Sequence, residues 1–313
     1  MQRKPFLLRF NDFWPNNQRA IENFFIPLIS RIVEGDIVVV KSNSVHVDLE
    51  VISVYPQKKS WLSVPFNQRI SRKFSRTNNY VIKKDIRRAN RIFWYSGENI
   101  RPPLHLEYDA YLCYDTEAYA KNVVYLPIWV LNLNWFGLPS PHGFISAYNK
   151  IEDLVNFRSL TPNDLSNRRF CCIFANHLNE MRNGTIHVLS ELGEVDVFGY
   201  SGRISPKDKK AMASKYKFIL CPENNLYPGY VTEKLLEGYQ TTAFPIYWGQ
   251  DIKSYFNSKS HLNLATNGGL SASMSILSEL ISDEKLYLDR LNSPLLNSQF
   301  NLDSLINKLR SFL

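Results

Sequence analysis

The sequence lacks a long hydrophobic segment. None of its apolar runs approaches the roughly 20 residues that a membrane-spanning helix needs. The opening residues, MQRKPFLLRF, include basic side chains but no apolar core of a signal peptide and no small-residue cleavage site. A secreted or membrane-anchored protein would need such a segment, so we predict a cytoplasmic location.

Cysteine is scarce as well. The chain of 313 residues has 4 cysteines, all in apolar surroundings that are typical of strands: Cys113, Cys171, Cys172 and Cys221. The neighbouring pair at 171 and 172 would point to opposite faces of a strand, and no spacing is typical of a metal site. We therefore expect reduced thiols that pack in the core.

The excess of positive charge is confined to one segment. The formal net charge is +8, and residues 69–91 contain nine Lys or Arg and a single acid, Asp85, so this basic segment accounts for the whole excess. It could contact an anionic membrane surface, an anionic substrate or nucleic acid, or form a solvated surface. The nearby aromatic residues form no known nucleic-acid motif, so we expect no nucleic-acid partner and favour a membrane surface among the specific alternatives.

The length suits two domains, and a hydrophobic content of 44% indicates a globular protein. Strands alternate with helices in both halves, which predicts two Rossmann-like α/β domains with parallel sheets. We predict an N-terminal domain over residues 1–160 and a C-terminal domain over residues 161–290. Residues 291–313 would contain a last helix that packs on protein and crosses back to the first domain, with a membrane-surface role as the alternative.

The predicted elements follow from apolar periodicity. Pro27 should kink or shorten the first helix, and residues 37–40 should form a buried strand. The predicted strands cover residues 6–10, 37–40, 49–55, 91–95, 108–114, 123–126, 170–174, 195–198, 218–221 and 244–248. The predicted helices cover residues 21–32, 183–192, a segment from Ser205, a segment from Thr232, 276–288 and 300–313.

One stretch organises the second half: the strand FILC from Phe218, a polar loop, and an amphipathic helix. Thr232 should be the N-cap, with Glu233 and Lys234 in the first turn. Lys234 opposes the helix dipole there, but an ammonium beside free backbone N–H groups would suit an anion such as a phosphate. The alternative is a solvated surface lysine beside Glu233.

Two motifs resemble those of the α-1,3/4-fucosyltransferases of bacterial type, glycosyltransferase family 10. The first runs from Glu223 to Lys234 and continues in PIYWG at residues 245–249; the second is FWYSGENIRP at residues 93–102. The resemblance covers roughly residues 90–250. It implies the GT-B fold, in which two Rossmann-like domains enclose a cleft.

The resemblance also implies a function. Such an enzyme transfers L-fucose from GDP-fucose to a hydroxyl of a glycan acceptor, with inversion and most often in α-1,3 linkage. A bacterial member would build a surface glycan such as lipopolysaccharide, as a peripheral protein at the inner face of the cytoplasmic membrane. The sequence contains no Asp-x-Asp, the usual metal–diphosphate ligand pair, so we expect a reaction without a metal or other cofactor.

Five donor-site residues are carried over from the resemblance. Arg182 and Lys234 would hold the diphosphate, and Asn224 and Tyr230 would face the nucleotide. Glu233 would contact the fucose and stabilise positive charge on its ring. The alternatives are an ordinary surface ion pair for Arg182 and a first-turn acid that complements the helix dipole for Glu233.

Glu98 is the expected general base. It follows a strand and a glycine turn, which would place it at the carboxyl end of a strand in the first domain, across the cleft from the donor. The alternative is a loop glutamate that bonds to Arg101 or to backbone. Because the first ninety residues carry no family motif, the acceptor stays open, and a GT-B transferase for another nucleotide sugar is the main alternative function.

Overall fold

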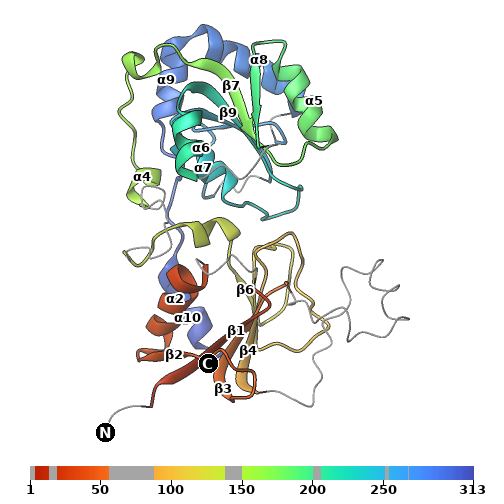
Figure 1. Ribbon diagram of the computed structural model, residues 1–313, viewed down its shortest axis with the longest axis vertical. Coiled ribbons are helices and arrows are strands. Elements are labelled where there is room, and N and C mark those ends of the chain that lie inside the picture. Colours follow the sequence, from red (N-terminus) through yellow and green to blue (C-terminus); the bar gives the residue numbers. More distant parts are fainter. Residues whose placement is uncertain are drawn as a thin grey trace, which may run out of the picture. The chain divides into compact units, whose positions relative to one another are not determined.

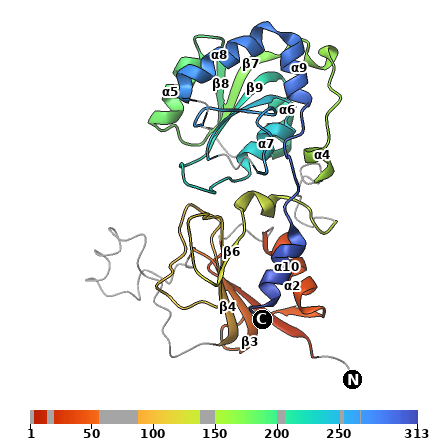
Figure 2. The ribbon, with the colours of Figure 1, turned by 180° about the vertical axis from the view of Figure 1, so that it is seen from behind.

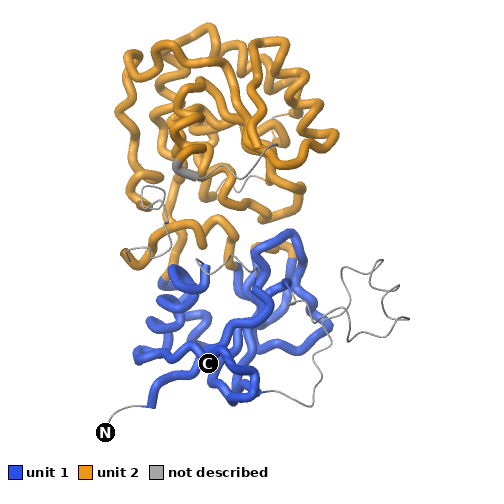
Figure 3. Tube along the Cα trace, in the orientation of Figure 1, with its two compact units in different colours: residues 1–113, 118–125, 303–313 blue, residues 114–117, 126–302 orange. Residues whose placement is uncertain are grey.

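The computed structural model describes residues 4–13, 20–55, 88–137, 150–199, 206–250, 254–266 and 268–313, without the side chains of residues 206 and 207. The chain forms two compact units (Figure 3). Unit 1 comprises residues 1–113, 118–125 and 303–313, and unit 2 comprises residues 114–117 and 126–302. The domain limits near residues 160 and 290 stay predictions. The basic segment lies outside the described residues except for residues 88–91.

Unit 1 contains a six-stranded parallel sheet (Figure 1). Its strands, in spatial order, are β2 (Ile37–Val39), β1 (Phe6–Asn11), β3 (Val47–Ile52), β4 (Ala89–Tyr95), β5 (Ala110–Cys113) and β6 (Val123–Tyr125). The predicted parallel sheet is confirmed. The prediction of a buried strand at residues 37–40 is wrong, because β2 is an edge strand and exposes Val38 and Val39.

The first helix of unit 1 changes its winding just before Pro27. A π-helical turn, η1 (Ile21–Phe25), leads into the α-helix α2 (Ile26–Val33), so the proline lies in the first turn, where its missing N–H is tolerated. Helix α10 (Leu302–Arg310) lies beside α2 in both views (Figures 1 and 2). Arg310 donates to the carbonyl oxygens of Arg31 and Ile32.

Unit 2 contains a five-stranded parallel sheet. Its strands, in spatial order, are β11 (Leu262–Asn263), β10 (Phe244–Trp248), β9 (Tyr216–Pro222), β7 (Arg169–Phe174) and β8 (Val195–Phe198). Helices α5 (Glu180–Leu189), α8 (Gly269–Ser282) and α9 (Glu284–Asn292) pack on one face of the sheet through a shared apolar cluster. Helices α6 (Pro206–Ala213) and α7 (Lys234–Gln240) contact strand β9, and α7 also contacts β10.

Helix α7 can approach β9 closely because it carries a glycine. A Cβ atom at Gly238 would overlap with the Sγ atom of Cys221 on β9. The other short helices in the described part of unit 2 are η4 (Ile128–Asn132), α4 (Glu152–Val155) and η6 (Pro162–Leu165). All four cysteines are free and buried, as predicted.

Two helix predictions need correction. The helix predicted over residues 276–288 is in fact α8 and α9, because Asp283 has an extended backbone and accepts a hydrogen bond from the Leu286 N–H at 2.9 Å as the N-cap of α9. Helix α5 begins at Glu180 instead of residue 183, because Asn179 caps it by accepting from the Arg182 N–H at 3.0 Å. No helix in the described ranges is long and apolar enough to cross a membrane.

Candidate active site

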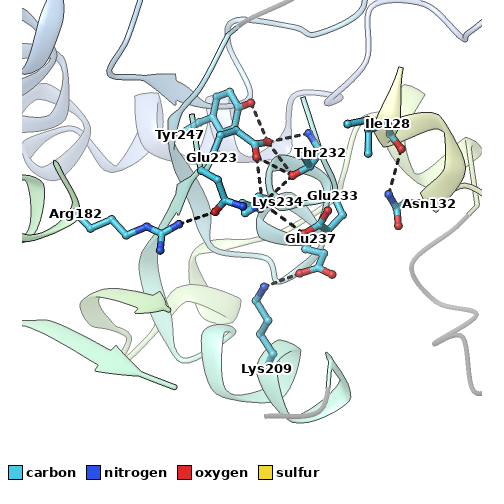
Figure 4. Close-up of polar contacts among 11 residues, drawn as sticks. Ile128, Asn132, Arg182, Lys209, Glu223, Thr232, Glu233, Lys234, Glu237 and Tyr247 are labelled. Carbon is cyan, nitrogen blue, oxygen red and sulfur yellow. Dashed lines mark hydrogen bonds and ion pairs between the residues drawn. The ribbon is translucent and has the colours of Figure 1, made fainter. Parts of the chain in front are cut away.

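The candidate site of unit 2 lies where strands β7, β9 and β10 end (Figure 4). In parallel α/β sheets, ligands bind at the carboxyl ends of the strands, because the loops that follow the strands converge there. Five of the six predicted site residues follow β7 or β9 in unit 2. The sixth, Glu98, belongs to unit 1.

The structure brings Arg182 and Asn224 into direct contact. Nη2 of Arg182, on helix α5, donates to Oδ1 of Asn224 at 3.1 Å, and Nη1 donates to the carbonyl oxygen of His177 at 2.6 Å. The Nε atom is buried and has no hydrogen-bond partner among the described residues. Burial lowers the pKa of the guanidinium, and the nearby Glu223 opposes this effect. A cation with an unused buried N–H suits an anionic ligand.

Lys234 is the first residue of α7 and lies among three oxygen atoms. Its Nζ atom is 3.1 Å from Oε2 of Glu223, 3.0 Å from Oγ1 of Thr232 and 3.6 Å from Oε1 of Glu233. Burial lowers the pKa of the ammonium, but the two carboxylates outweigh burial and raise the pKa overall. The side chain keeps 23% of its surface exposed, so a charged Lys234 can still contact a ligand.

Glu223 is a site residue that the sequence analysis did not assign. Its side chain is 0% exposed, and its carboxylate accepts from the Thr232 N–H at 2.8 Å, the Thr232 hydroxyl at 2.7 Å and the Tyr247 hydroxyl at 3.2 Å, as well as from Lys234. Burial raises the pKa of Glu223, and Lys234 opposes this. In the sequence, a glutamate between a strand and an Asn-Asn pair looks like a solvated loop residue. Only its position at the start of the family motif could have indicated a role in the site.

The predicted N-cap role of Thr232 is wrong. Helix α7 begins at Lys234, its N-cap position is Glu233, and no side chain caps it. The reason is that Glu223 engages both the N–H and the hydroxyl of Thr232. Burial raises the pKa of Glu233, but Lys234, Lys209 and hydrogen bonds together lower it, so Glu233 is a carboxylate. Since α7 has only 7 residues, we attribute the preference for an anion to side chains and not to the helix dipole.

Tyr230 is buried within unit 2. Its ring packs edge-on against Tyr114, with the ring centroids 5.2 Å apart. The preceding Gly229 has a φ of +83°, and a Cβ atom there would overlap with the carbonyl oxygen of Tyr114, so this close approach requires glycine. The structure therefore gives Tyr230 a packing role, and its contact with the nucleotide stays a prediction.

Glu98 follows strand β4 in the predicted turn. The Ser96 hydroxyl donates to the carbonyl oxygen of Glu98 at 2.8 Å, and the Glu98 N–H approaches the Ser96 Oγ atom at 3.3 Å. A Cβ atom at Gly97 would lie 2.7 Å from the buried Tyr95 hydroxyl, which explains the glycine. The turn thus fixes the backbone of Glu98, while its role as general base stays a prediction.

The described residues contain no group of three or more His, Cys, Asp or Glu side chains that could hold a metal ion. Independence of a metal stays a prediction.

Comparison with known proteins first defines the class of fold. The chain superimposes on the crystal structure of an α1,3-fucosyltransferase with a TM-score of 0.69 at 18% identity, over 98% of this chain and 90% of that one. A crystal structure titled as an α1,3-fucosyltransferase with GDP-fucose gives a TM-score of 0.65 at 20% identity, over 100% and 92% of the two chains. The two parallel α/β units therefore form a GT-B fold, as the resemblance implied.

The sequence of unit 2 is similar to a known family. Residues 166–292 match the family model described as glycosyltransferase family 10 (fucosyltransferase), C-terminal part. The chain is also 27% identical over 239 residues to the α-(1,3)-fucosyltransferase FucT of Helicobacter pylori. That match covers 67% of this chain and 48% of the relative, so the chain spans about half the relative's length.

Proposed function

We propose that the protein transfers L-fucose from GDP-fucose to a hydroxyl group of a glycan, forming an α-1,3 linkage. The observation that carries this proposal is the pair of cations Arg182 and Lys234 near Glu223 in a family 10 domain, with the buried Nε atom of Arg182 unused within the described chain. The H. pylori relative supports the linkage, and the related structure with GDP-fucose supports the donor.

The reaction needs charge stabilisation at the leaving group. The acceptor oxygen forms a bond to the anomeric carbon while the bond from that carbon to the diphosphate oxygen breaks, and GDP leaves with growing negative charge. Arg182 and Lys234 would stabilise this charge electrostatically. The Glu233 carboxylate would stabilise the positive charge that develops on the sugar ring.

Glu98 would take the proton of the acceptor hydroxyl as that oxygen attacks. Attack on the face opposite the leaving group gives an α-linked product from a β-linked donor, so the transfer inverts the configuration. We expect Glu98→Gln to lower kcat by about 100- to 10,000-fold while GDP binding is unchanged, because an amide cannot accept the proton. Full transfer activity of this variant in a GDP-release assay would contradict the role.

The donor is tested by calorimetry in EDTA with GDP, GDP-fucose, GDP-mannose and UDP-glucose. We expect selective binding of GDP and GDP-fucose without a metal, and weaker binding by Arg182→Met and Lys234→Met. Lys285→Met is the matched control, because Lys285 is an exposed lysine on α9. If the protein prefers another nucleotide sugar, the assignment of GDP-fucose as the donor is wrong. A requirement for a divalent ion would contradict metal independence.

We place the reaction in the synthesis of a bacterial surface glycan such as lipopolysaccharide, at the inner face of the cytoplasmic membrane. The excess of positive charge in residues 69–91 supports contact with an anionic membrane. The test is sedimentation with vesicles that contain anionic lipid. Neutralisation of Arg87, Arg88 and Arg91 should weaken binding, and unchanged binding would remove this part of the proposal.

A further inference from the structure

The buried carboxylate of Glu223 pairs with a charged group, which a purely structural hydrogen-bond acceptor would not need. Two of its partners, Thr232 and Tyr247, are neutral, and either could be satisfied by an uncharged acceptor. Its third partner is the ammonium of Lys234, at 3.1 Å, and Lys234 is partly exposed while Glu223 is fully buried. A buried charge is costly unless a charged partner compensates it, and Lys234 is that partner.

The contacts of Lys234 show what Glu223 fixes. A lysine has four rotatable bonds and would otherwise distribute its ammonium over many positions. Here the ammonium lies between Oε2 of Glu223 and the Thr232 hydroxyl, which itself donates to the same Glu223 oxygen at 2.7 Å. Glu223 therefore holds the ammonium both directly and through Thr232.

The same carboxylate also closes the loop that carries Asn224. It follows strand β9 and accepts from the backbone N–H of Thr232, so residues 223–232 form a loop that is tied at its base. The Glu223 N–H donates to the carbonyl oxygen of Trp248 at 2.8 Å, which joins this base to strand β10. Asn224, the next residue, contacts Arg182.

We propose that Glu223 is a positioning residue of the donor site, which holds the Lys234 ammonium and the base of the 223–232 loop in the geometry that receives the diphosphate. The inference rests on the proposed function, since it assumes that Lys234 contacts phosphate. Glu223 itself does not touch the donor. Its negative charge is partly balanced by Lys234, so the ammonium is ordered before the ligand arrives.

The test compares the GDP affinity of the full-length wild type, Glu223→Gln, Lys234→Met and the double variant by calorimetry. Glu223→Gln should bind GDP about 10- to 100-fold more weakly, because the amide loses a charged hydrogen bond to Lys234. The double variant should bind within about twofold of Lys234→Met, since Glu223 acts through Lys234. Affinity for guanosine, which has no phosphate, should not change.

Glu237→Gln is the matched control. Glu237 also lies on α7 and pairs with a lysine, Lys209, at 2.5 Å. Among the described residues, no hydrogen bond or ion pair joins it to Lys234. It should leave GDP affinity unchanged. Glu223→Asp is a second variant for the case in which Glu223→Gln does not fold, because it keeps the negative charge but has a side chain one methylene shorter. It should weaken GDP binding without weakening guanosine binding.

The outcomes separate the inference from the proposed function. If the wild type does not bind GDP, the proposed function fails. If the wild type binds GDP and Lys234→Met binds it weakly, but Glu223→Gln and Glu223→Asp bind it normally, only the inference fails. Equal losses for GDP and guanosine, or fully additive losses in the double variant, would show that Glu223 merely stabilises the fold and would also overturn the inference.

Discussion

Two arginines, one in each unit, differ in how completely the protein satisfies their N–H groups. Arg9, on strand β1, is 3% exposed, and its Nε and Nη2 atoms donate to Glu50 at 3.1 and 3.2 Å. Its Nη atoms also donate to three carbonyl oxygens, those of Ser42, Val45 and Arg88. Arg182, on helix α5 of unit 2, has a buried Nε atom without a partner among the described residues.

The difference separates a structural charge from one that can bind a ligand. Arg9 and Glu50 satisfy each other, and the remaining N–H groups of Arg9 join the start of β4 to the loop before β3. Nothing is left for a ligand to add. Arg182 lies where the loops after parallel strands converge and keeps an N–H unused, so an anion would complete its hydrogen bonding.

The largest effect on stability is expected when the ion pair of Arg9 and Glu50 is broken. Arg9→Met should lower the free energy of unfolding by about 3–5 kcal/mol, because it leaves the Glu50 carboxylate buried without its partner. Denaturant titration followed by tryptophan fluorescence measures this. The double variant Arg9→Met with Glu50→Leu should recover most of the loss, since no buried charge remains. A normal stability for Arg9→Met would mean that the pair does not differ from Arg182 as we describe.

Substitution of Arg182, whose Nε atom has no partner among the described residues, should affect ligand binding more than stability. Arg182→Met should weaken GDP binding by about 1.5–3 kcal/mol, the usual contribution of a hydrogen bond to a charged group, and change stability much less. Calorimetry and denaturation on the same sample measure both quantities. Asn224→Ala is a useful second variant, because it leaves the guanidinium in place and removes one of its partners. A loss of stability with unchanged GDP binding would make Arg182 a structural residue like Arg9.

A third variant tests a site residue that is held by its backbone. Gly97→Ala would bring a Cβ atom to 2.7 Å from the Tyr95 hydroxyl, and Tyr95 cannot move aside easily because its ring packs against Phe13 and Phe25. The turn should shift, and with it Glu98. We expect kcat to fall about tenfold, equivalent to about 1.4 kcal/mol, with GDP binding unchanged.

Tyr95→Phe provides the control for this variant, because it removes the atom that the new Cβ would meet. The double variant should regain most of the lost kcat. If Gly97→Ala alone keeps full activity, the turn does not determine the position of Glu98.

Local patterns in the sequence predicted much of the fold. Strands β8 and β10 were predicted over the residues that form them, because β10 is a short apolar run and β8 is apolar except for Asp196. The change of helix at Pro27 also follows from one residue. The break at Asp283 was missed, since an aspartate inside an apolar periodicity resembles a solvent-facing helix residue until its cap contact is seen.

The site was less predictable because its contacts join distant parts of the chain. Arg182 and Asn224 are 42 positions apart, and Arg9 and Glu50 are 41 apart. The family resemblance supplied Arg182 and Lys234 as candidates, but it could not show that Glu223 is buried or that it occupies the groups with which Thr232 would cap α7. Burial of a charge depends on tertiary packing, and residue type alone predicts exposure for glutamate.

The smallest effect is expected for the ion pair of Lys209 and Glu237. Its side chains are 22% and 29% exposed, so Glu237→Gln should lower the free energy of unfolding by only about 0.5–1 kcal/mol at neutral pH. Burial lowers the pKa of Lys209, but Glu237, with smaller contributions from Cys221 and Glu233, raises it overall. The folded protein therefore holds this proton more tightly than the unfolded chain does. The stabilisation is complete below the ordinary lysine pKa of about 10.4 and is lost as the pH rises through the raised value.

Denaturant titrations at increasing pH measure this effect. The difference in the free energy of unfolding between wild type and Glu237→Gln should shrink in alkaline solution. A difference that stays constant would mean that the pair contributes through packing and not through charge.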